Sequence, residues 1–445
     1  MLKRKIYDEL LSWKKNKKEE CLLIKGARQV GKTFIINKFG KDNYKNFFEI
    51  NFIFYPEMKT IFSGSLEVDE IIMRLSLHFP NASFIAGETL IFFDEIQVCP
   101  QARTALKSFA IDKRFDVIAS GSLLGLHYGQ DPEIEEEITS IPVGYEREMV
   151  MYSLDYEEFL WAKGFKDEQI QYIKGFFERE EIIPHEINER MQDLFRQYMV
   201  VGGMPSVVTK FIDTNNMSEV HIEQERILSS YLDDIGRHAK CVEKQKVRKC
   251  WLSIPKQLAK ENKKFQYTKV EHGGNARKFS GSIQWLVDAS IANMCTNVSV
   301  PHFPLSAYED ESYFKLYTTD TGLLIAMYGY DMKLAILNKT LTHDVKLGIY
   351  ENIIAEMLIK KGYKLHYYKP VENDQEIEFL ISKQGKIYPI EVKAKNGSTI
   401  SLNRYIDKFH PEKTYKFIDG NIGKENERLT LPHYMAMFLD TDINQ

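Results

Sequence analysis

The first third of the chain alternates short apolar runs with segments in which apolar residues recur at helical spacing. Four apolar runs predict strands: Leu22–Ile24, Phe47–Phe52, Leu90–Phe93 and Phe115–Ser122. Periodic segments predict helices over residues 1–20, 66–79 and 102–110. Apolar runs without alternation are typical of strands that are buried on both faces of a parallel sheet. The pattern therefore predicts an α/β domain.

The pattern becomes helical from about residue 155 to residue 240. Its clearest interruption is Gly202–Gly203 followed by Pro205, which predicts the end of one helix and the start of the next. Two interpretations stay open: a hinge of a helical lid, or only a tight turn.

Beyond this helical region the pattern predicts a winged helix. Helices are expected over 254–261 and 279–293, and a β-prone tail contains Val298, Val300 and Phe303. A strand and a helix over 313–328 would close that domain. The last hundred residues then predict another α/β domain, with a helix over 346–363 and strands over 364–369, 376–381, 386–394 and 414–418.

Composition adds few restrictions. The 445 residues are 44% hydrophobic and 27% charged, so a substantial core is expected and wholesale disorder is excluded. The net charge of −4 shows no overall basic character, so any nucleic-acid site must be local. Five scattered cysteines contain no CxxC pair, which fits a reducing cytoplasm. No apolar run reaches the roughly 20 residues of a membrane span, so no membrane partner is expected.

The first predicted strand leads into GARQVGKT, Gly26–Thr33, which fits GxxxxGK(S/T) and precedes a predicted helix. Gly26 and Gly31 allow the loop to turn its N–H groups toward phosphate, and the helix N-terminus adds positive potential. Lys32 can reach the β- and γ-phosphates, and the Thr33 hydroxyl can ligate Mg²⁺. The predicted cofactors are therefore ATP and Mg²⁺. The residues expected to bind the nucleotide are Gly26, Ala27, Arg28, Gln29, Val30, Gly31, Lys32, Thr33 and Phe34.

The second half of the predicted site follows the run Leu90–Phe93, which ends in Asp94 and Glu95. Carboxylates at the end of a buried parallel strand lie at the ligand edge of the sheet. Asp94 is expected to hold Mg²⁺ through water, and Glu95 to polarise the attacking water. Ser120 or Ser122, at the end of the next predicted strand, either contacts the γ-phosphate region or only caps the strand end. Arg147 and Arg237 are weaker candidates for contacting phosphate, and ordinary surface roles are favoured for both.

One local stretch, residues 240–278, is strongly basic, with twelve lysines and arginines against three acidic residues. A basic winged helix can place its second helix in a DNA groove with lysines on phosphates. Because the helix expected over 279–293 contains no basic residue, a structural winged helix with a solvated basic face is the alternative.

Three glutamates and one lysine follow the order of a PD-(D/E)xK nuclease core: Glu351 on the predicted helix, Glu378 on a strand, and Glu391 and Lys393 on the next strand. Carboxylates can hold Mg²⁺, here Glu378 and Glu391, and the lysine can polarise the attacking water.

Several motifs occur in a characteristic order: GARQVGKT, FFDEIQ, SGSLLGL, YEEFLWA, GGMPSVV, KLYTTDTGLL, GIYENIIAEML and EIEFLI…PIEVKAK. With them the chain resembles a large prokaryotic family of AAA+-type ATPases. That family joins a C-terminal winged helix to a PD-(D/E)xK-like fold of uncharacterised function. The resemblance implies an α/β chain with four parts: an ATPase core over 1–154, a helical lid over 155–240, a winged helix over 241–340 and a restriction-endonuclease-like domain over 341–445.

The function expected is that of a cytoplasmic ATPase that acts on DNA through its C-terminal region, with possible assembly into a homo-oligomer. The alternative is a nucleotide-controlled switch whose nuclease-like domain is inactive. Glu378 favours this alternative, because the family usually has aspartate there and Mg²⁺ demands near-ideal octahedral geometry. A DNA-independent signalling ATPase is the third interpretation.

Overall fold

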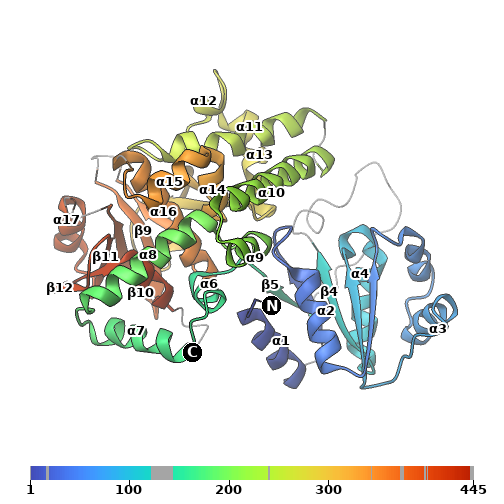
Figure 1. The fold of residues 1–445 in the computed structure, drawn as a ribbon. Helices are drawn as coiled ribbons and strands as arrows, with labels where there is room; N and C mark the ends of the chain where they lie inside the picture. The colour runs from blue at the N-terminus through green and yellow to red at the C-terminus, as the bar shows by residue number, and fades with distance from the viewer. Residues whose placement is uncertain are drawn as a thin grey trace. The chain divides into compact units, whose positions relative to one another are not determined.

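The structure is a computed structural model. It describes residues 2–16, 20–121, 144–238, 241–341, 343–370, 375–394, 397 and 399–440. The chain divides into two compact units (Figure 1). The N-terminal unit contains Arg4–Tyr152 and Asp288–Ser290, and the C-terminal unit contains Met1–Lys3, Ser153–Val287 and Ile291–Gln445. The finer division into four domains stays a prediction.

The N-terminal unit is built on a five-stranded sheet in which all neighbouring strands are parallel. The strand order is β2-β3-β4-β1-β5. The strands are β1 (Cys21–Lys25), β2 (Asn46–Asn51), β3 (Thr89–Asp94), β4 (Asp116–Gly121) and β5 (Glu146–Val150). The helices are α1 (Lys5–Lys15), α2 (Lys32–Asn43), α3 (Val68–His78) and α4 (Pro100–Asp112), with 3-10 turns at Pro56–Phe62 and Ile96–Val98. The fold class predicted for this part is confirmed.

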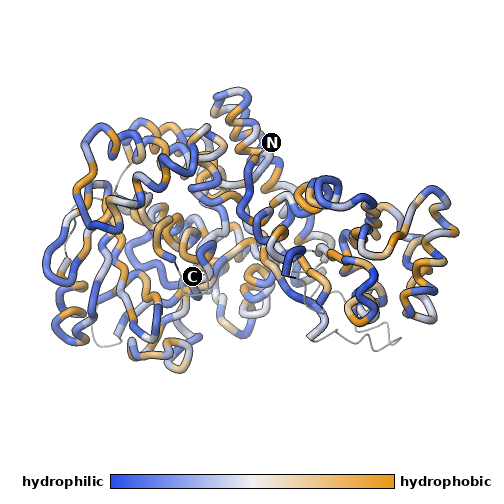
Figure 2. Tube along the Cα trace, turned by 90° about the horizontal axis from the view of Figure 1, so that it is seen from below, coloured by the Kyte–Doolittle hydropathy of each residue, from blue (hydrophilic) through white to orange (hydrophobic). Residues whose placement is uncertain are grey.

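The two faces of this sheet are covered by different helices. Figure 1 shows α2 and α4 on opposite faces. Ala102, Leu106 and Phe109 of α4 are buried in one cluster with Phe93 and Ala119 of the sheet. Along the helices of the unit, apolar and polar residues interleave, as expected when one helix face packs on a sheet (Figure 2). Because β4 lies between β1 and β3, its carboxyl end lies between the ends of the two strands that carry the nucleotide motifs.

The C-terminal unit begins with five helices and ends in a large mixed sheet. The first helices are α6 (Tyr156–Ala162), α7 (Asp167–Arg179), α8 (His185–Val201), α9 (Pro205–Thr214) and α10 (Met217–His238). The later helices are α11 (Cys241–Leu258), α12 (Tyr267–Val270), α13 (Ala276–Asp288), α14 (Thr321–Tyr328), α15 (Tyr330–Leu337), α16 (His343–Lys360) and α17 (Ile400–Phe409). Among the described residues, no helix is both long and apolar enough to cross a membrane.

The mixed sheet has eight strands in the order β12-β13-β11-β10-β9-β8-β6-β7. They are β6 (Ala292–Val298), β7 (Glu309–Thr318), β8 (His366–Tyr368), β9 (Ile377–Lys383), β10 (Lys386–Val392), β11 (Thr414–Ile418), β12 (Gly423–Glu425) and β13 (Arg428–Pro432). The antiparallel pair β6-β7 joins β8 in parallel, and β10 pairs antiparallel with β9 and parallel with β11. The strands predicted for the winged helix and for the nuclease-like core therefore belong to one sheet.

Two helix boundaries predicted in the basic region are wrong. The first helix, α11, begins at Cys241 rather than at Ile254, because Val247, Cys250 and Ile254 are buried at helical spacing and continue one apolar face. Pro255 lies inside this helix instead of in its first turn.

The second helix, α13, runs from Ala276 to Asp288 and not over 279–293. Ser290 has a left-handed φ of 55° that turns the chain, and Ala292–Val298 then pairs with β7 and β8. Sheet pairing therefore overrides the helical periodicity of that segment. Val300 and Phe303 lie beyond the strand.

Candidate nucleotide site and a buried carboxylate cluster

The loop Gly26–Thr33 joins β1 to α2 at the carboxyl edge of the parallel sheet. Gly31 adopts a left-handed φ of 96° at the N-cap of α2, a conformation that glycine adopts without steric cost. Gly26 is required by close packing, because a Cβ there would lie 2.2 Å from the Met151 carbonyl oxygen. The two glycines of the motif thus shape a loop that ends in a helix N-terminus, as a phosphate site needs.

Lys32 is buried at the start of α2, and its Nζ donates to the carbonyl oxygens of Gly26 (2.9 Å) and Ala27 (2.8 Å). Burial lowers the pKa of Lys32 to about 8, while the nearby carboxylates of Glu95 and Asp94 oppose this shift. The ammonium group therefore lies inside the loop, close to both predicted acidic residues.

Asp94, at the end of β3, accepts hydrogen bonds from residues on three other elements. The Thr33 hydroxyl of α2 donates to Oδ2 (3.0 Å), as does the Asn51 amide of β2 (2.8 Å). The Ser120 hydroxyl of β4 donates to Oδ1. The structure thus brings together the predicted residues Thr33, Asp94 and Ser120, whereas Ser122 lies outside the described residues.

Asn51 belongs to this cluster, although the sequence analysis did not name it. The strand register places Asn51 directly beside Asp94. Its Oδ1 also accepts from the backbone N–H groups of Ile53 and Phe54, both at 3.0 Å. The sequence signal was a polar residue next to the last position of the predicted strand Phe47–Phe52.

Glu95 follows β3 in a left-handed conformation with φ of 56°. Such a conformation is uncommon for a residue with a side chain and costs of order 1–3 kcal/mol. Its carboxylate accepts a hydrogen bond from the Gln97 side chain. The strand therefore ends at Asp94, and Glu95 lies in the turn that follows it.

The remaining predicted nucleotide contacts lie around the loop. Val30 is buried, Gln29 has a left-handed φ of 64°, Arg28 is half-buried and lowers the pKa of Lys32, and Phe34 is 63% exposed on the first turn of α2. Arg147 lies on the edge strand β5, 3.9 Å from a Glu20 carboxylate oxygen, so the surface ion pair is the arrangement found. The side chain of Arg237 lies outside the described residues.

The C-terminal unit gathers the four residues predicted for the nuclease-like core. Lys393, just after β10, donates from Nζ to Glu378 Oε1 on β9 (2.9 Å) and lies 3.2 Å from Glu391 Oε1. Both glutamates are buried. Burial, reinforced by the charges of Glu391 and Glu351 and opposed by Lys393, raises the pKa of Glu378 to about 7. Burial also raises the pKa of Glu391.

Glu391 is the least satisfied member of this cluster. Neither of its carboxylate oxygens makes a hydrogen bond, and the residue is fully buried. A buried carboxylate without donors is costly unless a cation or a proton neutralises it. The ammonium of Lys393, 3.2 Å from Oε1, supplies a positive charge beside Glu391. The described residues contain no group of three or more His, Cys, Asp or Glu that could hold a metal ion.

Glu351, on α16, has a different set of partners. Its carboxylate lies 3.0 Å from Lys263 Nζ and 3.5 Å from Lys315 Nζ, and it accepts a hydrogen bond from Tyr317 (3.0 Å). Burial would raise the pKa of Glu351, but the two lysines outweigh it and lower the pKa to about 2. Lys315 is itself completely buried and also pairs with Glu376. Glu351 is therefore already neutralised by lysines.

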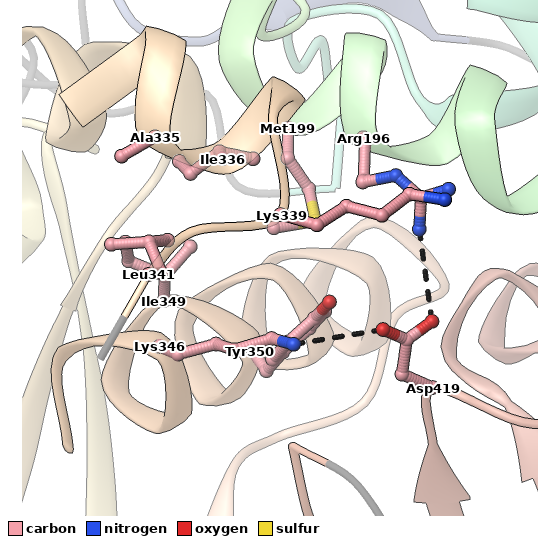
Figure 3. A pocket seen from close by; sticks show the side chains of 10 residues that line it. All are labelled: Arg196, Met199, Ala335, Ile336, Lys339, Leu341, Lys346, Ile349, Tyr350 and Asp419. Carbon is pink, nitrogen blue, oxygen red and sulfur yellow. Dashed lines mark ion pairs between the residues drawn. The ribbon is translucent and has the colours of Figure 1, made fainter. Parts of the chain in front are cut away.

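A hollow elsewhere in the C-terminal unit lies between α8, α15 and α16 (Figure 3). Asp419, after β11, lies 3.7 Å from Arg196 and 3.6 Å from Lys346 across it. The cavity volume is about 20 Å³, which leaves room for about one water molecule. This hollow is too small to be a ligand site.

Comparison with known families and structures complements this geometry. Residues 18–160 match the AAA domain family. Residues 18–160 therefore form a P-loop ATPase domain of the AAA type. Residues 192–334 match a domain of unknown function, DUF8612, and residues 348–433 match another, DUF4143. No curated protein matches the chain.

Solved structures similar to this chain include a Walker-type ATPase and a nucleotide-bound DnaA. The Walker-type ATPase of Pyrococcus abyssi is 13% identical, with a TM-score of 0.42 over 74% of this chain and 96% of its own. AMPPCP-bound DnaA from Aquifex aeolicus is 11% identical, with a TM-score of 0.28 over 64% of this chain and 88% of its own. Because both TM-scores are below 0.5, the assignment of the ATPase domain rests on the family match and the geometry of the loop.

The lowered pKa of Lys32 predicts that nucleotide affinity depends on pH. Phosphate binding needs the charged ammonium, which is present below a pKa of about 8 and is lost as the pH rises through it. We expect ATP affinity to fall about tenfold between pH 7 and pH 9, since roughly a tenth of the lysine stays charged one unit above its pKa. Titration with a fluorescent ATP analogue measures this. A Lys32→Arg variant keeps its charge throughout, so an equal fall in that variant would contradict the assignment to Lys32.

Proposed function

We propose that this chain binds ATP with Mg²⁺ and hydrolyses it. The observation that carries the proposal is the convergence of Thr33 and Asn51 on Asp94, beside the buried ammonium of Lys32. Thr33 and Asp94 fit a magnesium ion, since a hydroxyl and a carboxylate are oxygen donors of the kind Mg²⁺ prefers. The ion would supply charge neutralisation at the phosphates.

Each residue of the site then has a separate role. Lys32 would bind the β- and γ-phosphates, together with the backbone N–H groups of Gly26–Thr33. Glu95 would orient the attacking water and accept its proton. Asn51 and Ser120 would hold the Asp94 carboxylate in one orientation, because each donates to a defined oxygen of that group.

We further propose that the C-terminal unit acts on DNA. Arg277 and Lys278 support this, because they lie exposed in the first turn of α13, which begins before the basic-free segment 279–293 that was predicted as the helix. Lys278 shares the Glu271 carboxylate with Lys249, so part of the basic face is neutralised within the protein. The order α11, α12, α13, β6, β7 is that of a winged helix, whose second helix can enter a groove of DNA.

The nuclease-like cluster supports two candidate functions. The buried carboxylates of Glu391 and Glu378, with Lys393 beside both, support metal-dependent cleavage, in which the two glutamates would hold Mg²⁺ and Lys393 would position the attacking water. The alternative is a nucleotide-controlled binding switch without cleavage. It is favoured by Glu351, whose charge Lys263 and Lys315 already neutralise, so that one predicted carboxylate is committed to the fold.

Cleavage assays on plasmid and branched DNA with Mg²⁺ or Mn²⁺, with and without ATP, separate these functions. Loss of cleavage in Glu391→Ala and Lys393→Ala, with retention in the exposed control Glu412→Ala, would establish a nuclease. No cleavage in any condition, alongside intact ATP turnover, would establish the switch. ATP turnover that survives in Lys32→Ala would contradict the ATPase proposal itself.

Three broader features belong to the same proposal. A cytoplasmic location is supported by free, buried thiols, which are those of Cys21, Cys99, Cys250 and Cys295.

DNA binding predicts that the affinity for DNA falls steeply with added salt. An affinity for DNA that does not change with salt would favour a DNA-independent signalling ATPase. Assembly into a homo-oligomer stays a prediction, which sedimentation of the ATP-bound protein would measure.

A further inference from the structure

The chain passes from one unit to the other at four places, two of which border the segment 4–152 that contains the nucleotide loop and its sheet. One passage is between Lys3 and Arg4, and the other is between Tyr152 and Ser153. The second passage is a short connection, because β5 ends at Val150 and Asp155 is the N-cap of α6. Only four residues, Met151–Leu154, connect these two rigid elements, and we call them the coupling segment.

Within the N-terminal unit, the first half of the coupling segment is fastened to the nucleotide loop. The Met151 N–H donates to the Lys25 carbonyl oxygen (2.7 Å), and the Met151 carbonyl packs against Gly26 so closely that no Cβ would fit. The buried Arg4 guanidinium donates to the Val30 carbonyl oxygen (3.1 Å) and to the Tyr152 carbonyl oxygen (2.7 Å). The start of the loop contacts Met151 directly, and Val30 within the loop is linked to Tyr152 through Arg4.

Within the C-terminal unit, the second half of the coupling segment is held by a buried polar network. The Leu154 N–H donates to the Gly203 carbonyl oxygen (2.7 Å). The Leu154 carbonyl oxygen accepts from the Tyr198 hydroxyl (2.8 Å) and from Lys360 Nζ (2.9 Å), and the Ser153 hydroxyl lies 2.9 Å from the same Nζ. A Cβ on Gly203 would lie 2.0 Å from the Leu154 carbonyl oxygen, so the fit depends on glycine.

The same network continues along α16 to the carboxylate cluster. Lys360 Nζ donates to Glu356 Oε1 (2.7 Å), and the Tyr198 hydroxyl oxygen lies 3.0 Å from the same carboxylate oxygen. Glu356 Oε2 accepts from the backbone N–H and the hydroxyl of Thr321. Glu351, which binds Lys263 and Lys315, lies on the same helix. Helix α16 thus carries both Lys360, which donates hydrogen bonds to the coupling segment, and Glu351, which belongs to the nuclease-like cluster.

We propose that Met151–Leu154 transmits the nucleotide state of the ATPase domain to α16, and that Arg4 is a positioning residue in this link. A change in the loop on binding ATP would displace residues 151–152 through Arg4 and Gly26. Residues 153–154 cannot absorb that displacement, because Gly203, Tyr198 and Lys360 hold their backbone. The displacement therefore reaches α16. This inference rests on nucleotide binding at Gly26–Thr33, and it adds the route by which that site regulates the C-terminal unit.

Hydrogen exchange of the full chain, with and without Mg²⁺ and a non-hydrolysable ATP analogue, tests the link. In the wild type we expect slower exchange in two places upon binding, the nucleotide loop and α16. Arg4→Lys, which loses the double donation to Val30 and Tyr152, should keep the response of the loop and lose that of α16. Arg4→Lys should also raise the KM for ATP, while its kcat stays close to that of the wild type.

Two variants at the end of α16 give a matched comparison. Lys360→Met removes the contacts to Ser153 and Leu154, and the double variant Glu356→Gln with Lys360→Met avoids an unpaired buried carboxylate. Lys361→Met removes a neighbouring charge that pairs with Asp440 instead. Loss of the α16 response in both Lys360 variants, but not in Lys361→Met, supports the link. If the exchange response of α16 is unchanged in all variants, the proposed link is wrong. If the nucleotide loop of the wild type responds to the analogue and α16 does not, the link is also wrong, although ATP binding is then established.

Discussion

Replacing Glu95 with glutamine will stop ATP turnover while leaving ATP binding in place. Glutamine keeps the shape of the side chain and an oxygen that can accept from Gln97, but it cannot take a proton from water. Because general-base catalysis contributes about 10²–10⁴-fold, turnover should fall by that factor. Lys32, Thr33 and Asp94 are untouched, so the affinity for Mg²⁺–ATP should remain close to that of the wild type.

Phosphate release and calorimetric titration with ATP measure the two quantities separately. Glu57→Gln is a suitable control, because Glu57 is exposed in the same unit and contributes nothing to the site. Turnover that persists in Glu95→Gln would show that another group activates the water. A joint loss of turnover and binding would show instead that Glu95 supports the loop, through its charge beside Lys32.

The grouping of the candidate nucleotide-site residues was largely predictable from the sequence, because each part of the candidate site occupies one local segment. GARQVGKT and the acidic pair after Leu90–Phe93 each occupy one short segment, and parallel strands bring their carboxyl ends to one edge. Asn51 was not predicted, since a single polar residue at the end of a strand has no distinctive spacing. Only the register of β2 beside β3 shows that its amide reaches Asp94.

The C-terminal unit was predicted less completely, because buried lysines leave no pattern in a sequence. Lys263 was counted among the basic residues of a DNA-binding face, yet it is 4% exposed and pairs with Glu351. Lys315 lies on β7, in the motif KLYTTDTGLL, and was not predicted to be a site residue. The roles of both lysines as partners of Glu351 become apparent only from the structure, in which β6 and β7 belong to the same sheet as the nuclease-like core. Most residues in a charged stretch of sequence are exposed to solvent, but tertiary packing determines whether a particular lysine is exposed or buried.

Removing the charge of Glu351 will destabilise the C-terminal unit rather than simply impair a metal site. In Glu351→Gln, the buried Lys263 and Lys315 lose a shared carboxylate, and breaking a buried ion pair in this way costs about 3–5 kcal/mol. Urea unfolding followed by tryptophan fluorescence measures the loss, since Trp161, Trp251 and Trp285 all belong to this unit. If Glu351 served mainly as a metal ligand, the variant would lose cleavage and keep its stability.

Glu271 provides the matched control for burial. It also pairs with two lysines, Lys249 and Lys278, and they lower its pKa to about 2, but its side chain is 32% exposed. Since exposed pairs are screened by water and salt, Glu271→Gln should change stability little, and less still at high salt. Equal destabilisation by both substitutions would contradict the argument from burial.

The pH dependence of the Glu351 effect has a definite sign. The pKa of Glu351 is about 2 in the folded protein, whereas an unfolded glutamate has a pKa of about 4.3. A carboxylate with a lowered folded pKa stabilises the protein fully above its unfolded pKa, and this contribution is lost as the pH falls toward the folded pKa. The difference in unfolding free energy between wild type and Glu351→Gln should therefore be constant from pH 7 to pH 5 and shrink from pH 4 downward. A difference that grows as the pH falls would mean that Glu351 is protonated in the folded protein and that the two lysines find their counter-charge elsewhere.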